Sequence, residues 1–337
     1  MCSIKMTENK LEILKRTQQG DILEPTPFAM WRHFPEDDLY ADRLAKKQLE
    51  YLDKFDSLVM KVSPNGRYCV VDWGCEIAFD KKRMSGSAYC TKYRINTIDD
   101  WITLEELDVT QGMFGEQLKA LELISNGMKN QTPFVETIFN PLMVASKLTE
   151  KKDLIIQSIK ENPKTFHEGL KVITKVMTDF ARISIENGAV GIFLATQEAT
   201  YDLLTEKEFK EFGMNYDLDL LNDIKGKTDF NMVHIHGDNI MFDYIAKNYP
   251  VEALNWHDQL TAPSIAEASK IFDGILMGGI EEKEFLLKAT DEELTSKIQE
   301  VIDSVNGQRL IIAPGCVIPI NILDEKVKVI INYLDSH

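Results

Sequence analysis

Short apolar segments alternate with longer amphipathic ones along most of the chain, and this alternation restricts the fold more than any other feature of the sequence. The short segments are four to eight residues long and mostly apolar on both faces, as strands inside a parallel sheet are. There are seven of them, at residues 55–62, 133–139, 189–195, 230–236, 251–256, 274–277 and 309–313. Repetition of strand, helix and strand predicts a parallel sheet with right-handed crossovers.

The amphipathic segments between these strands have recognisable helix ends. Asn162 is suited to begin a helix whose apolar residues recur every three or four positions, and Gly188 is suited to end it. Thr290 and Glu293 have the spacing of a capping box. These signals predict a helix after most of the strands.

Seven such strands with intervening helices predict a closed (β/α)8 barrel of the TIM type, formed by residues 1–337 as a single domain. An open, doubly wound sheet is the alternative fold, but the turn at 63–66 lacks the G-x-G-x-x-G pattern of dinucleotide-binding sheets. Residues 67–95 alternate between polar and apolar, which is typical of antiparallel strands. We expect them to form a small β insertion after the first barrel strand, covering one mouth of the barrel.

The charge and the cysteines restrict partners and compartment. The chain has 38 basic and 54 acidic residues and a net charge of −16, which repels phosphate backbones, so we expect no nucleic-acid partner. It lacks the apolar core of a signal peptide and any run of ~18 apolar residues, so we expect no membrane segment. An odd number of cysteines argues against a disulfide framework and for a cytoplasmic protein. They are Cys2, Cys69, Cys75, Cys90 and Cys316.

Two histidines and a cysteine are the strongest candidates for chemistry, because working residues of such barrels follow the C-terminal ends of the strands. His234 and His236 are two residues apart on a predicted strand and therefore point to the same side. Cys316 follows the last predicted strand and could reach the same space. Two imidazoles and a thiolate suit zinc with a fourth position open to substrate. The alternative is a histidine pair that hydrogen-bonds substrate beside a small buried cysteine.

Three residues at the end of the segment 251–256 are further candidates. Asn255 is a candidate substrate-binding residue. Asp258 could orient an imidazole, as carboxylates behind metal-bound histidines do. His257 is a candidate general acid. We therefore expect His257 and Asp258 to be catalytic.

Other polar and aromatic residues are candidates to bind the substrate. Glu136 and Gln197 belong to the ends of two predicted strands, although Gln197 could equally cap a helix or bond within a loop. Trp31 could line an aromatic pocket for a planar or quaternary substrate, with core packing as the alternative.

The segment 233–238 (VHIHGD), followed far downstream by 312–319 (IAPGCVIP), resembles the H-x-C-G…G-C pattern of the methylcobalamin-dependent methyltransferases of the uroporphyrinogen decarboxylase superfamily. The segments 27–32, 255–258 and 276–280 follow in the same order as in that superfamily. The resemblance implies zinc bound by His234, His236 and Cys316, and a methyl group exchanged with a corrinoid (cobalamin). No D-x-H-x-x-G pattern of a corrinoid-binding module occurs, so a partner protein would carry the corrinoid.

The chain departs from this pattern at one ligand. His236 stands where the methyltransferases have cysteine. A site with two histidines and one cysteine carries one negative charge fewer, so its zinc would be a stronger Lewis acid. Oxygen and nitrogen substrates therefore remain open beside thiols.

The porphyrin decarboxylase branch fits less well. Its N-terminal motif has two arginines that hold propionates, whereas the segment 30–35 retains only Arg32. Its catalytic aspartate is replaced in the segment 55–64, where Lys61 and Ser63 stand. A tetrapyrrole with many carboxylates also needs a basic cleft, of which this acidic sequence gives little sign.

Two alternatives to the methyltransferase remain. One is a metal-independent lyase acting on a carboxylate substrate held by Arg32. The other is a non-catalytic barrel that binds a tetrapyrrole or corrinoid. The methyl donor, the methyl acceptor and the oligomeric state, a homodimer included, stay open.

Overall fold

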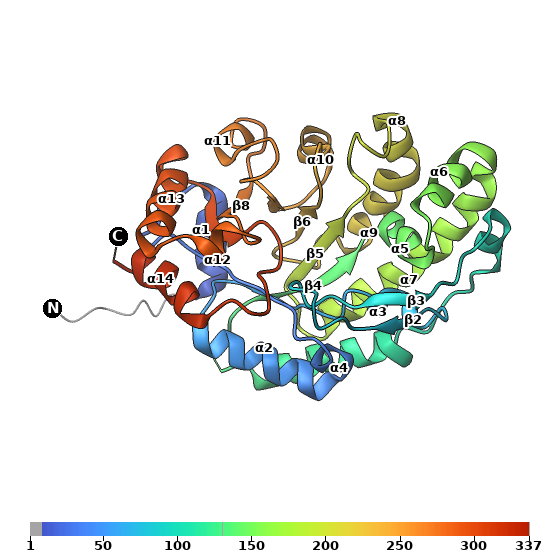
Figure 1. Ribbon diagram of the computed structural model, residues 1–337, viewed down its shortest axis with the longest axis horizontal. Coiled ribbons are helices and arrows are strands. Elements are labelled where there is room, and N and C mark those ends of the chain that lie inside the picture. The colour runs from blue at the N-terminus through green and yellow to red at the C-terminus, as the bar shows by residue number, and fades with distance from the viewer. Residues whose placement is uncertain (1–8, 130, 337) are drawn as a thin grey trace.

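A curled sheet stands at the centre of the molecule and helices surround it, as Figure 1 shows for the computed structural model, which describes residues 9–129 and 131–336. Cys2 lies outside the described residues. Seven parallel strands form the sheet in the order β1-β4-β5-β6-β7-β8-β9. They are β1 Met60–Lys61, β4 Phe134–Phe139, β5 Gly191–Thr196, β6 Met232–Ile235, β7 Ala253–Trp256, β8 Ile275–Ile280 and β9 Leu310–Pro314. All seven predicted strands are confirmed, although Phe55 ends the helix α2 instead of beginning β1.

Residues 27–30 close the ring between β9 and β1. The backbone N–H of Ala29 donates to Ile312 O at 2.9 Å, and the N–H of Ile312 donates to Pro27 O at 2.8 Å. On the other side, the N–H of Leu58 donates to Phe28 O at 3.0 Å. The segment thus stands in the place of an eighth strand, and the predicted (β/α)8 barrel is confirmed.

Helices follow most strands and pack against the outside of the barrel. Their bounds are α1 Lys10–Gln19, α2 Ala41–Phe55, α3 Tyr68–Val71, α4 Gly112–Gly127, α5 Pro141–Leu148, α6 Lys152–Glu161, α7 Pro163–Glu186, α8 Glu206–Phe209, α9 Asn215–Ile224, α10 Phe242–Asn248, α11 Ile265–Ala268, α12 Phe285–Lys288, α13 Asp291–Ser304 and α14 Asp324–Leu334, with short η1 Asp37–Leu39, η2 Ile98–Thr103 and η3 Lys210–Met214. The predicted caps are confirmed: Asn162 caps α7, and Thr290 and Glu293 form a capping box on α13. None of the described helices combines the length and the apolar character needed to cross a lipid bilayer.

The predicted insertion contains fewer strands than the alternation indicated. In the chain between β1 and β4, β2 Glu76–Ala78 and β3 Tyr89–Lys92 form an antiparallel pair that is separate from the barrel sheet. Residues 68–71, which the alternation assigned to a strand, form the helix α3. Helix packing overrides the pattern here, because Tyr68 is fully buried against Phe114 and donates its hydroxyl hydrogen to Thr137 O at 2.8 Å.

A buried carboxylate fixes helix α5, which carries Lys147 to the inside of the molecule. Asn140 caps α5 through its side-chain oxygen and donates from Nδ2 to both carboxylate oxygens of Asp217, at 3.0 and 3.1 Å. Tyr249 donates its hydroxyl hydrogen to Asp217 as well, at 2.6 Å. The network joins α5, α9 and the end of α10 in a region without solvent contact.

Asp217 should make stability depend on pH. Burial raises the pKa of its carboxyl from 3.8 to about 7. Between these values the folded protein keeps a proton that the unfolded chain has released, so stability falls as pH rises. Asp217→Asn removes this titration, and we expect the free energy of unfolding of the variant, relative to wild type, to rise by about 2 kcal/mol from pH 5 to pH 8 in urea denaturation. The exposed Asp219→Asn is the control, and a difference independent of pH would contradict the assignment.

Candidate metal and substrate site

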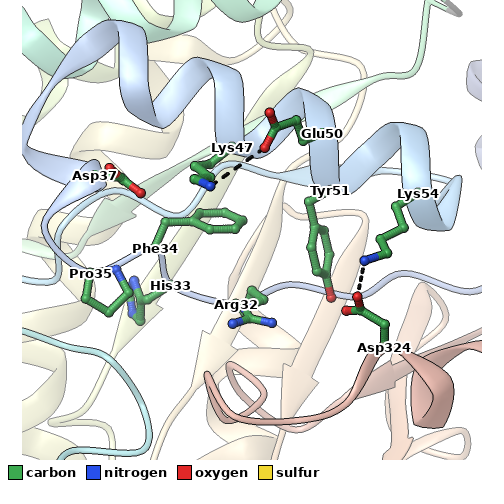
Figure 2. A pocket seen from close by; sticks show the side chains of 10 residues that line it. All are labelled: Arg32, His33, Phe34, Pro35, Asp37, Lys47, Glu50, Tyr51, Lys54 and Asp324. Atoms are coloured by element: carbon green, nitrogen blue, oxygen red, sulfur yellow. Dashed lines mark hydrogen bonds and ion pairs between the residues drawn. The ribbon is translucent and has the colours of Figure 1, made fainter. Parts of the chain in front are cut away.

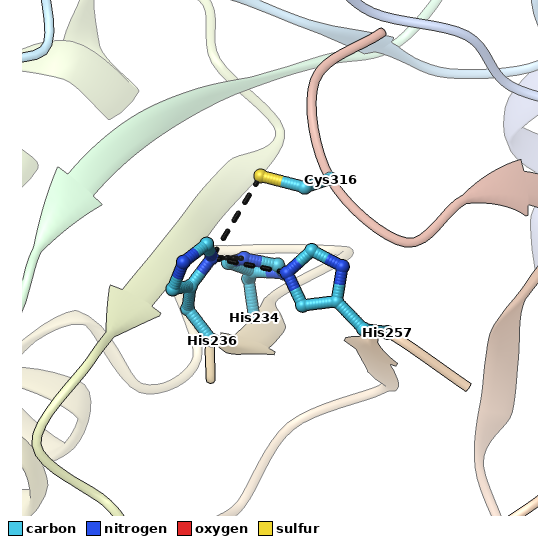
Figure 3. Close-up of side chains that lie close together, drawn as sticks. All are labelled: His234, His236, His257 and Cys316. Atoms are coloured by element: carbon cyan, nitrogen blue, oxygen red, sulfur yellow. Dashed lines mark hydrogen bonds between the residues drawn. The ribbon is translucent and has the colours of Figure 1, made fainter. Parts of the chain in front are cut away.

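Four potential metal ligands converge at the C-terminal ends of three barrel strands. His234 lies in β6 and His236 directly after it, His257 follows β7, and Cys316 follows β9. Their ligand atoms all lie within 4.8 Å of one another, and Figure 3 shows the three imidazoles and the thiol directed at one point. His236 Nδ1 is 3.2 Å from His257 Nε2, 3.4 Å from His234 Nε2 and 3.9 Å from Cys316 Sγ. We call these four residues the ligand cluster.

Asn255 determines which nitrogen His234 presents to the cluster. Its Nδ2 donates to Met277 O at 2.9 Å and to Pro314 O at 3.0 Å, so its Oδ1 must face His234 Nδ1, 2.7 Å away. His234 Nδ1 therefore carries the hydrogen, and Nε2 keeps a free lone pair toward the cluster. Asn255 is fully buried, and this contact places it behind His234, away from the space a substrate could enter.

The carboxylate of Glu282 lies beside His257. Its Oε1 is 3.0 Å from His257 Nδ1, within ion-pair distance but without hydrogen-bond geometry, and both side chains are almost fully buried. This contact directs His257 Nε2 into the cluster, as carboxylates behind metal-bound histidines do. The sequence interpretation placed His257 outside the metal ligands and missed Glu282, although a carboxylate three residues past Gly279 was a signal that could have been used.

Asp258, predicted to orient an imidazole, faces the backbone of β8 instead. Both its oxygens accept from the N–H of Gly279 at 3.1 Å, and one accepts from Gln259 Nε2 at 2.6 Å. The chain turns directly after His257, so the next side chain points to the neighbouring strand. Burial raises the pKa of Asp258 to about 6. The carboxylate that lies beside an imidazole is that of Glu282.

Burial sets the protonation of the ligand cluster. It lowers the pKa of His234 far below the ordinary value, with His236 and His257 adding to the effect. It also lowers the pKa of His236 to about 4 and raises that of Cys316 to about 11. Without a metal, His234 and His236 are therefore neutral imidazoles with free lone pairs, and Cys316 is a protonated thiol. A divalent cation binds such a group by displacing the thiol proton.

A cavity of about 290 Å³ opens from the ligand cluster. We call it the central cavity; it is lined by Trp31, His33, Lys61, Pro64, Gly66, Arg67, Arg83, Ser85, Ser87, Ala88, Thr137, Phe139, Met143, Lys147, Phe193, Ala195, Gln197, His234, His236, Cys316 and Val317. Trp31 and Gln197 both line this cavity, and their role in binding substrate stays a prediction. Residues 83–88 belong to the loop between β2 and β3, so the insertion covers this cavity.

Besides Asn255, two more predicted substrate-binding residues are not brought to this cavity. Arg32 lines a separate outer cavity of about 370 Å³ beside α2, where Tyr51 and Asp324 lie near it and Ile320 O accepts from its guanidinium (Figure 2). Glu136 is fully buried on β4, and its neighbour Thr137 lines the central cavity. Because side chains alternate along a strand, Glu136 points to the other face of the sheet.

Comparisons with known proteins identify one family and similar proteins of known activity. Residues 69–337 match the family described as uroporphyrinogen decarboxylase (URO-D). The chain is similar to the methylcobamide:CoM methyltransferase MtbA of Methanosarcina acetivorans, at 19% identity over 244 residues, 72% of this chain and 69% of the relative. It is also similar to the methylcobamide:CoM methyltransferase MtaA of Methanosarcina barkeri, at 24% identity over 269 residues, 78% of this chain and 75% of the relative.

Solved structures agree on the fold. A methyltransferase from Methanosarcina mazei superposes with a TM-score of 0.82 at 19% identity, covering 97% of this chain and 98% of the other. A B12-independent methionine synthase from Shewanella sp. W3-18-1 superposes with a TM-score of 0.57 at 11% identity, covering 94% and 95%. At these identities the likeness concerns the fold alone.

Replacing Asn255 should lower the stability of the barrel and release the tautomer of His234. Asn255→Ala removes the partner of the Nδ1 hydrogen of His234 and one donor to each of the carbonyls of Met277 and Pro314, and we expect a loss of at least about 2 kcal/mol in the free energy of unfolding. Urea denaturation measures the loss, and ¹H–¹⁵N spectra of the imidazoles should show His234 losing its preference for the Nδ1–H tautomer. The control is the exposed Asn248→Ala, which should change neither quantity. An unchanged tautomer in Asn255→Ala would contradict the assigned contact.

Proposed function

The chain belongs to the uroporphyrinogen decarboxylase family, and we propose that it is a zinc-dependent methyltransferase that moves a methyl group between a small substrate and a corrinoid carried by a partner protein. One observation carries the proposal: the ligand atoms of the cluster lie within 4.8 Å of one another at the end of a cavity large enough for a small molecule. The similarity to the methylcobamide:CoM methyltransferases supports the choice of reaction.

The donor atoms of the cluster fit zinc. Three imidazole nitrogens and one thiolate are the ligand types that zinc prefers, and the contacts of Asn255 and Glu282 point two of those nitrogens inward. His234, His236 and Cys316 would hold the ion, as the sequence predicts. We infer that His257 would be a fourth donor in the absence of substrate and would be free to act as a base in its presence.

Bound zinc would supply Lewis acidity, lowering the pKa of a substrate group that contacts it. The residues around it prepare the reaction. His257, once displaced, can accept the proton that the substrate's heteroatom loses, and Glu282 would pair with the imidazolium that forms. Trp31 and Phe193 pack edge to face at 5.9 Å and limit water beside the cluster. Gln197 lies on the cavity wall, where its amide can orient the substrate.

The rim of the barrel offers a surface for the corrinoid-carrying partner. Exposed apolar side chains lie in loops that follow the C-terminal ends of strands. They are Met84 after β2, Tyr201 after β5, Leu260 after β7 and Leu323 after β9. Exposed apolar side chains beside a cavity that must admit a cofactor suit contact with a partner protein. We propose that the corrinoid protein docks on this rim.

Metal content tests the site. We expect about one zinc per chain by elemental analysis of protein purified without an affinity tag or added metal. Cys316→Ala and His236→Ala should lose it, because each leaves the site one strong ligand short. His257→Ala should retain zinc with an affinity about 10–100-fold lower, since it leaves intact the proposed set of His234, His236 and Cys316, which Cys316→Ala and His236→Ala each break.

The matched controls for metal content are Cys75→Ala and His167→Ala, which lie outside the cluster. A protein that stays free of metal after incubation with zinc would overturn the proposal.

Methyl transfer tests the reaction. Zinc-loaded protein incubated with methylcobalamin and a panel of thiols, alcohols and amines should produce cob(I)alamin, detected by visible absorbance, together with a methylated acceptor. Removal of zinc by a chelator should abolish the turnover. Two results would contradict the proposal: activity on a carboxylate substrate that survives chelation, which indicates a lyase, and a change in the corrinoid spectrum without transfer, which indicates a binding protein.

A further inference from the structure

Three of the chain's cysteines gather in and beside the insertion that covers the central cavity, and none of them belongs to the ligand cluster. Cys69 lies in α3, Cys75 directly precedes β2, and Cys90 lies in β3. All three are buried and carry free thiols. Burial raises the pKa of Cys69 to about 12, so its thiol keeps its proton and is a poor nucleophile. Cys75 and Cys90 differ from it because they contact each other.

The side chains of Cys75 and Cys90 meet across the hairpin of β2 and β3. Cys90 is the partner of Ile77 in the register of the two strands, and Cys75 stands two residues before Ile77. Cys75 and Cys90 are 3% and 5% exposed, so both face the inside of the molecule. Their neighbours Glu76 and Thr91 are exposed to solvent. The thiol of Cys75 donates a hydrogen bond to the sulfur of Cys90.

The surroundings of Cys90 favour its thiolate. The hydrogen bond from Cys75 lowers the pKa of Cys90, and the positive charges of Arg67 and Lys147 act in the same direction. The same hydrogen bond and burial raise the pKa of Cys75, which therefore keeps its proton. A thiolate beside cations is the form of cysteine that attacks an oxidant, and a neighbouring thiol completes a disulfide with the product. The pair thus combines an attacking sulfur with a resolving one.

The hairpin that carries the pair is a cover over the central cavity. β2 and β3 have three and four residues and form a sheet of their own outside the barrel (Figure 1). Their connecting loop lines the cavity with Arg83, Ser85, Ser87 and Ala88. This loop is tied to the segment after β9, where the N–H of Ile320 donates to Met84 O at 2.8 Å. A two-stranded hairpin is only marginally stable by itself, so its local opening exposes the two sulfurs to small molecules.

We propose that Cys75 and Cys90 are an oxidisable pair whose disulfide locks this cover over the central cavity, with a peroxide as the oxidant. The Cys90 thiolate attacks a peroxide oxygen and breaks the O–O bond, which gives a sulfenic acid and hydroxide. The Cys75 sulfur then forms the S–S bond and displaces the sulfenic oxygen, which leaves as water with the Cys75 proton. The two cysteines lose two electrons, which the peroxide gains, and a thiol reductant reverses the step.

The disulfide restrains the cover without rebuilding it. Sulfurs in hydrogen-bond contact need only a small shift of this short hairpin to reach the S–S distance of about 2 Å. The bond joins the two ends of the segment 75–90, so the conformations in which β2 and β3 separate are lost. The oxidised protein keeps the closed cover, and the groups that line the cavity, Cys316 among them, become less accessible. This holds whichever reaction the barrel catalyses.

Peptide mapping tests the pairing. Full-length protein is treated with hydrogen peroxide, its remaining thiols are alkylated, and the chain is digested with trypsin. Trypsin leaves Cys75 in the peptide 68–81 and Cys90 in the peptide 84–92. We expect mass spectrometry to find these two peptides linked, and a thiol reductant to separate them. Cys90→Ser should lose the link and Cys69→Ser should keep it. Thiols that stay free, over-oxidation without the linked peptides, or a bond through Cys69 would each refute the pairing.

Alkylation of Cys316 tests the locking and needs neither zinc nor methyl transfer. Full-length protein freed of metal by a chelator reacts with iodoacetamide, and the labelled peptide 310–326 is quantified over time. We expect oxidation to slow the labelling of Cys316 at least about 10-fold, because the cross-link removes open conformations of the cover, and reductant to restore the rate.

Cys90→Ser, treated with peroxide in the same way, is the control for direct oxidation of Cys316 and should label at the rate of the reduced wild type. Circular dichroism before and after oxidation confirms that each protein stays folded. An unchanged rate in wild type that contains the linked peptides would overturn the locking, and so would an equal slowing in Cys90→Ser. Failure of the methyl-transfer assays leaves both of these results unaffected.

Discussion

The side chain of Asn255 ties together the strands that build the site. Its oxygen accepts from His234 on β6, and its nitrogen donates to the backbone of Met277 on β8 and of Pro314 on β9. A functional residue follows within a few positions on each of these strands or directly after it: His236 after β6, Glu282 after β8 and Cys316 after β9. A fully buried amide with three partners has one orientation, so the spacing of the cluster follows from backbone pairing. The site is therefore as rigid as the barrel itself.

The site residues that the sequence predicts are determined by local periodicity. The site residues that it misses depend on the direction in which the chain leaves a strand in the folded protein. The seven strands were predicted because buried parallel strands leave apolar runs. Residues two positions apart on a strand share a face, which placed His234 and His236 together. The position of His257 in the cluster depends on how the chain leaves β7, and the same turn sends Asp258 to Gly279. No periodicity encodes that turn. Glu136 is absent from the central cavity for a related reason. Neighbouring residues of β4 point to opposite faces of the sheet, so a shift of one position reverses the face.

Net charge proved a poor guide to the interior because it averages over the surface. Exposed acids such as Asp53 and Glu168 form ion pairs with Lys129 and Lys171 at the surface and are screened by solvent. Lys61 and Lys147 are buried, where screening is weak and each charge acts over a longer distance. A few buried cations therefore determine the potential inside the barrel, whatever the sign of the whole molecule.

The histidine at position 236, where the methyltransferases have cysteine, would raise the charge of a bound metal. Zinc held by two or three imidazoles and one thiolate would keep one net positive charge, whereas a second thiolate would neutralise it. The ligand cluster would then present positive potential to the central cavity, which Lys61 and Lys147 also line. A deprotonated heteroatom at the metal is the species that such a field would stabilise. The extra charge would thus offset the weaker electron donation of imidazole by favouring loss of the proton from that heteroatom at neutral pH.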